Sequence, residues 1–143
     1  MKKLLLISAL LLLNLSVFSQ NIFTAVKAND LAAVKYLLNK GANLNYVNSK
    51  GETALIIATQ NNNARMCDFL IEKDADINVQ DSQGNSALMY ATLSKNQDIV
   101  KVLIHHWANT NQRNHKGHSA LDFALKLKDV NMMQLFAVQN KNN

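Results

Sequence analysis

The chain has 143 residues, of which 48% are hydrophobic and 17% are charged, and its formal net charge is +5. This length gives room for one domain with a core of its own. Its lysines and arginines are spread along the chain without a basic block, so we expect no nucleic-acid partner.

The first 19 residues have the order of a secretory signal peptide. Two lysines precede an apolar run at 4–18, and Ser19 supplies the small residue before an expected cleavage at Gln20. The run is shorter than the roughly 20 apolar residues of a membrane span. An uncleaved membrane anchor and a buried first helix are the alternatives. Removal of 1–19 takes away two lysines and no acids, so the net charge falls from +5 to +3.

The short signal is typical of bacteria. We therefore expect a periplasmic or secreted protein, monomeric and without membrane contact after cleavage.

Three segments repeat one another 33 positions apart: GETALIIA (51–58), GNSALMYA (84–91) and GHSALDFA (117–124). A fixed period of this length indicates stacked structural repeats, which usually serve as binding surfaces. Other columns keep the same register: Ile22, Leu55, Leu88 and Leu121; Ala25, Ala58, Ala91 and Ala124; Leu37, Leu70, Leu103 and Phe136; Asn45, Asn78 and Asn111. The domain at 20–143 then divides into units at 20–48, 49–81, 82–114 and 115–143.

Each unit predicts two short helices. Thr53, Ser86 and Ser119 precede the first helix of their units and are suited to cap it. A polar break follows, and then a second helix with an apolar stripe. Between units, an extended polar segment with Gly at its turn predicts a projecting hairpin. The expected fold is all-α: a solenoid of four helix-turn-helix units with short β-hairpin loops.

The pattern resembles the ankyrin repeat over essentially all of 20–143. The tetrapeptide Thr-Pro-Leu-His of that family is represented by TALI (53–56), SALM (86–89) and SALD (119–122). The later elements of the repeat are represented by VKYLL (34–38) and GANLN (41–45), and again by VKVLI (100–104). The tetrapeptide proline is absent throughout. The glycine after the second helix remains only as Gly41 and is replaced by Asp74, Trp107 and Asn140. Trp tolerates the left-handed conformation poorly.

The resemblance implies that loop tips and the exposed faces of the first helices form a concave groove for another protein. Carried over by position, and with Trp107 added as a separate candidate, the partner-binding residues are Lys50, Glu52, Gln60, Gln83, Met89, Tyr90, Leu93, Arg113, His115, Lys116, Phe123 and Trp107. Tyr90 and Phe123 are the expected anchors. Trp107 either anchors a partner or covers the end of its helix, and we favour covering.

No arrangement of residues indicates catalysis, a metal or a cofactor. Cys67 shares its column with Val34 and Val100 and is interpreted as a small buried residue. All four histidines lie between 105 and 118, but adjacent His105 and His106 point about 100° apart on a helix, which disfavours a shared zinc ion. We therefore expect a non-catalytic binding module, either a scaffold or accessory protein, or alternatively an inhibitor or immunity protein that blocks an enzyme or toxin.

Overall fold

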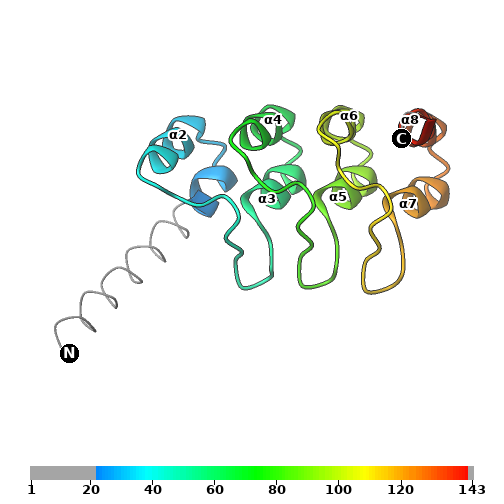
Figure 1. Ribbon diagram of the computed structural model, residues 1–143, viewed down its shortest axis with the longest axis horizontal. Coiled ribbons are helices and arrows are strands. Elements are labelled where there is room, and N and C mark those ends of the chain that lie inside the picture. The colour runs from blue at the N-terminus through cyan, green and yellow to red at the C-terminus, as the bar shows by residue number, and fades with distance from the viewer. Residues whose placement is uncertain (1–21, 142–143) are drawn as a thin grey trace.

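The computed structural model describes residues 22–141, whose helices lie in two layers (Figure 1). A short helix at 22–27 pairs with α2 (Leu31–Asn39). The later pairs are α3 (Ala54–Gln60) with α4 (Ala64–Glu72), α5 (Ala87–Leu93) with α6 (Gln97–His105), and α7 (Ala120–Lys126) with α8 (Val130–Lys141). The helix at 22–27, α3, α5 and α7 form the inner layer, and α2, α4, α6 and α8 form the outer layer. The all-helical repeat solenoid is confirmed.

The predicted signal peptide at 1–19 lies outside the described residues. Within 22–141, no helix combines the length and the apolar character that crossing a membrane requires.

Helix starts follow the 33-residue period, because the capping residues do. Asp30, Asn63 and Asn96 accept a backbone N–H at the starts of α2, α4 and α6. Thr53 caps α3 as predicted, and Ser119 forms a capping box with Asp122 on α7. Ser86 occupies the N-cap position of α5 as predicted, but its side chain makes no capping hydrogen bond. Ser86 instead belongs to an antiparallel bridge with Gln80.

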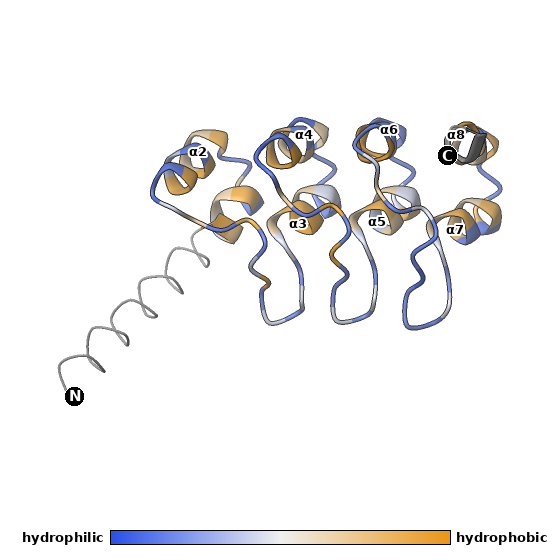
Figure 2. Ribbon diagram, viewed as in Figure 1, coloured by the Kyte–Doolittle hydropathy of each residue, from blue (hydrophilic) through white to orange (hydrophobic). Residues whose placement is uncertain are grey.

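The core lies between the two helix layers. Columns of small and branched apolar residues face inward and are almost completely buried, for example Ala58 and Ala91 at 0% exposure and Leu70 and Leu103 at 0%. Alanine on the inner helices lets successive units approach closely. Figure 2 shows the contrast, with hydrophobic colour concentrated on the helices and mostly hydrophilic colour on the projecting loops.

Each outer helix except the last ends on a residue with positive φ. Gly41 has φ +88°, and Asp74 and Trp107 adopt φ 64° and 62°, as their place in the glycine column predicts. The expected helix end at Asn140 is wrong, because α8 continues to Lys141. Lys141 occupies the column in which Ala42, Ala75 and Ala108 donate back to the preceding helix and close it.

The loops at 48–52, 81–85 and 114–118 share one construction. A single Asn or Asp side chain accepts two backbone N–H groups of its own loop: Asn48 from Lys50 and Glu52, Asp81 from Gln83 and Asn85, Asn114 from Lys116 and His118. These are Asx turns, which fix the loop locally. The loops project as expected, but within the described residues the predicted hairpins form no strands, and their β pairing is the isolated Gln80–Ser86 bridge.

Successive loops also bond to each other through their main chains. Ser82 donates its N–H to the Lys50 carbonyl at 3.0 Å, and His115 donates to the Gln83 carbonyl at 3.0 Å. This approach explains why Gly51 and Gly84 are glycines. A Cβ on Gly51 would lie 2.7 Å from Ser82 N, and one on Gly84 would lie 2.8 Å from His115 N.

The repeated asparagine column forms a second connection between units. Asn45 Oδ1 accepts the Asp76 N–H at 2.8 Å, and Asn78 Oδ1 accepts the Asn109 N–H at 2.8 Å. Each bond joins residues 31 positions apart. Asn45 and Asn78 therefore each satisfy a backbone donor of the following unit. This is a physical reason for asparagine to recur in this column.

Replacing Gly84 by Ala should destabilise the protein more than replacing Gly117 by Ala. Both glycines have φ near +80°, so each substitution carries a left-handed penalty of about 1–2 kcal/mol. Only the Gly84 substitution also collides with the next loop, since nothing lies within 4 Å of a Cβ on Gly117. We expect a loss of about 3 kcal/mol or more for Gly84→Ala, measured by urea unfolding. Equal losses for the two variants would contradict the proposed loop contact.

Candidate protein-binding site

Three loop tips form an exposed row along one edge of the stack. Lys50, Gln83 and Lys116 occupy one column of the repeat, and all three are exposed. Figure 1 shows their loops projecting side by side on the same side of the helices. We call these three residues and exposed His115 the loop row. Since the loops are bonded to one another, the loop row is held in place before any partner arrives.

Arg113 lies in the third loop but is already engaged. Its guanidinium donates to the Gly117 carbonyl at 2.6 Å and to Asp122 Oδ2 at 3.0 Å. Hydrogen bonds from Ser119, followed by the charge of Arg113, lower the pKa of the Asp122 carboxyl. Arg113 therefore fastens the loop to α7, and less of its charge is free for a partner.

The inner helices contribute a second exposed column next to the loops. It contains Gln60, Leu93 and Lys126, all exposed. Leu93 is 42% exposed, which makes it an apolar contact point between two polar neighbours. We call these three residues, with the aromatic pair Tyr90 and Phe123, the inner face.

The aromatic pair is half-buried and held by polar neighbours. Tyr90 donates its hydroxyl to Asp81 Oδ2 at 2.5 Å, and the Phe123 ring lies 5.6 Å from the His118 ring. Burial, followed by the hydrogen bond to Asp81, raises the pKa of the Tyr90 phenol above its ordinary value. Both rings are thus partly packed and partly accessible, which suits them to anchor a partner.

Two predicted binding residues are not at the surface. Met89 is 1% exposed and belongs to the core, so its assignment to the groove is wrong. Ile56, which occupies the same column, is also 1% exposed. Glu52 is 9% exposed, and its carboxylate accepts hydrogen bonds from Asn48 at 2.7 Å and Gln60 at 3.0 Å. Glu52 therefore orders the first loop and does not project from it.

Trp107 is exposed and separate from the other candidates. Its side chain is 68% exposed, so the interpretation that it covers the helix end is wrong. It follows α6, in the outer layer, away from the loop row. As an exposed aromatic it stays a candidate anchor, but it does not share a surface with Tyr90 and Phe123.

The outer helices carry a repeated aromatic–lysine pair that was not among the predicted binding residues. Tyr36 and Phe69 share one column, and each carries a lysine four residues later, with Lys40 Nζ 5.6 Å and Lys73 Nζ 5.9 Å from the respective ring centroids. The recurrence of an aromatic residue with a lysine four positions later is visible in the sequence and could have identified this surface.

The histidines do not converge. The rings of His105 and His106 meet edge to face at 5.3 Å, and His106 Nε2 lies 3.4 Å from Asp68 Oδ1 of α4. His115 and His118 lie in the third loop. Among the residues that the structure describes, no group of three or more His, Cys, Asp or Glu side chains is placed to hold a metal ion.

Cys67 is a core residue, as predicted. It is 0% exposed, with its sulfur 3.5 Å from Thr59 Oγ1. Burial raises the pKa of the Cys67 thiol from 9.0 to about 11. A buried thiol with a raised pKa is a poor nucleophile, so the cysteine serves packing.

The raised pKa of Cys67 should make the protein lose stability in alkaline solution. The thiol ionises more easily in the unfolded chain, so its contribution is complete below about pH 9 and is lost as the pH rises toward about 11. Two pKa units correspond to about 2.7 kcal/mol. In Cys67→Val, which copies Val34 and Val100, this part of the pH dependence should disappear from the urea-unfolding free energy. An identical decline in both proteins would show that the thiol does not resist ionisation.

Comparison with known proteins agrees with the repeat architecture. No curated protein matches the chain. The family model for ankyrin repeats (3 copies) matches residues 22–114 and 74–143, which together span nearly all of the repeats. That family is a non-catalytic protein-interaction fold. The chain belongs to the ankyrin-repeat family.

Proposed function

We propose that the protein works without catalysis, by binding one protein partner through the loop row and the inner face. The observation that carries the proposal is the row of exposed loop tips, which main-chain hydrogen bonds hold in register with the exposed Leu93. Ordering these side chains in advance lowers the entropic cost of association.

The chemistry of this surface suits a partner with both apolar and acidic groups. Leu93, Tyr90 and Phe123 supply apolar area, while Lys50 and Lys116 supply positive charge at the tips. Aromatic anchors flanked by charged residues are typical of protein interfaces.

We also propose that the partner is met in the periplasm or outside the cell, where the protein acts as a scaffold or accessory protein. The support is the order of charge, apolar run and small residue in the first 19 positions. Neither a scaffold nor an accessory protein requires a reactive residue.

The test is capture of partners from envelope extract by the C-terminally tagged full chain after chemical crosslinking. Leu93→Glu and Lys116→Glu should each lower capture at least tenfold, because each places a repelling charge in the interface. Lys101→Glu on α6 is the matched control, an exposed lysine in the outer layer, and should leave capture unchanged.

Equal capture by all four proteins would contradict the proposed surface. The mass of the purified bait reports on location in the same experiment: a chain that begins at Gln20 supports export, and an intact Met1 in the cytoplasm contradicts it.

A further inference from the structure

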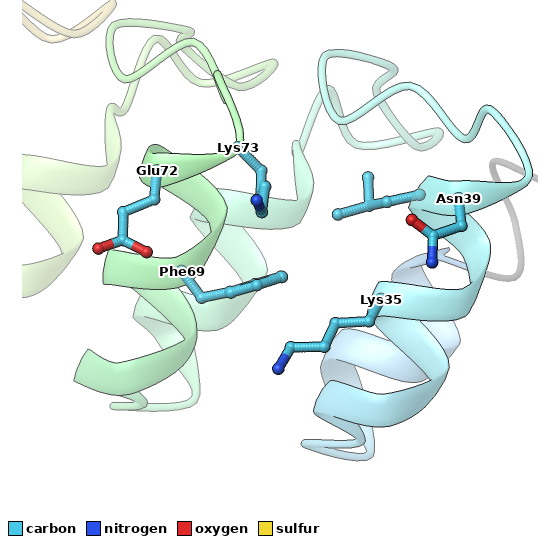
Figure 3. Close-up of a pocket in the computed structure, with 6 residues that line it drawn as sticks. Lys35, Asn39, Phe69, Glu72 and Lys73 are labelled. Carbon is cyan, nitrogen blue, oxygen red and sulfur yellow. The ribbon is translucent and has the colours of Figure 1, made fainter.

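A groove lies on the outer helix layer, between α2 and α4, away from the loop row (Figure 3). Its volume is about 700 Å³, within the usual range for ligand pockets. It is lined by Lys35, Leu38, Asn39, Phe69, Glu72 and Lys73. The groove opens here because α2 and α4 meet less closely than α4 and α6, or α6 and α8.

The groove has an aromatic floor between two cations. Lys35 Nζ lies 5.4 Å and Lys73 Nζ 5.9 Å from the centroid of the Phe69 ring. Figure 3 shows both lysines reaching toward the ring from different helices, while the Glu72 carboxylate points away from it. Partly buried Leu38 adds apolar surface on the α2 side.

The two ammonium groups lack a carboxylate. Among the described residues, no ion pair includes Lys35 or Lys73. Figure 3 shows the two ammonium groups on opposite sides of the Phe69 ring, so the ring separates the two charges. A ligand with an acidic group on each side of the ring would pair with both lysines, so the arrangement favours a negatively charged ligand.

We propose that this groove is a second binding site, for an acidic peptide segment that places one apolar side chain against Leu38 and the partly buried Phe69 ring, with one carboxylate at Lys35 and another at Lys73. The ring and Leu38 select the apolar residue, and the lysines select its acidic neighbours. Two lysines form too small a basic patch for a membrane surface or a nucleic acid, which bind several cations together. The site is independent of the loop row and goes beyond the function proposed above.

The third unit offers a control within the chain itself. Lys101 on α6 occupies the column of Lys35, but Asp98 lies 3.8 Å from its ammonium group, and the residue 34 positions further on, the separation of Lys35 and Phe69, is Leu135. A site that needs unpaired lysines and an aromatic floor should exist between α2 and α4 and not around Lys101.

The test uses the purified protein and a fluorescein-labelled peptide in which one Phe is flanked by runs of Glu. Fluorescence anisotropy should show saturable binding that weakens as salt increases. Lys35→Glu and Lys73→Glu should each weaken binding about tenfold or more, and Lys101→Glu less than twofold. Replacing the peptide Phe by Gly should also weaken binding several-fold. Since these lysines are exposed, the variants should keep the circular dichroism of the parent.

Several results would overturn the proposal. The first is that the unaltered protein does not bind the peptide at millimolar concentration. The second is that Lys35→Glu and Lys101→Glu weaken binding equally. The third is that the peptide without Phe binds as tightly as the original. Binding to anionic vesicles but not to the peptide would also overturn it. Leu93→Glu should leave peptide binding unchanged, so failure of this site and failure of the loop-row proposal are distinguishable.

Discussion

Main-chain contact between consecutive loops is the constraint on which the rest of this structure depends. Ser82 and His115 each donate an N–H to a carbonyl in the preceding loop, and that distance leaves no room for a Cβ on Gly51 or Gly84. The small alanines between inner helices obey the same spacing. A unit displaced outward by the width of a methyl group would lose both the hydrogen bonds between loops and the packing of the core.

The same constraint divides the polar residues into two groups. Some, such as Asn78, Asp81 and Glu52, form hydrogen bonds that hold loops and neighbouring units in place. Others, such as Lys50 and Lys116, project freely from the fixed loops. A partner therefore meets side chains whose backbone is already ordered, which is the physical basis for assigning binding to this edge. The outer layer obeys no such constraint between α2 and α4, and a groove opens there.

Much of the fold could be predicted because backbone conformation and burial repeat with the sequence period. The left-handed Trp107 and the buried Cys67 both follow from their columns. Side-chain direction does not repeat so strictly. Met89 shares its column with Asp122, and a column of mixed polarity does not reveal which side faces the core. Likewise, Lys35 and Phe69 are 34 positions apart and meet only once α2 lies beside α4.

Amide hydrogen exchange at Ser82 and His115 tests the stacking constraint most directly. If consecutive loops bond through their main chains, these two loop amides should exchange slowly, at rates close to those of core amides such as Leu70 and Leu103, because exposing them requires units to separate. Ser49 lies in the column of Ser82, but among the described residues its amide donates to no preceding loop, so it should exchange much faster. Exchange of Ser82 and His115 at the rate of Ser49 would contradict the account.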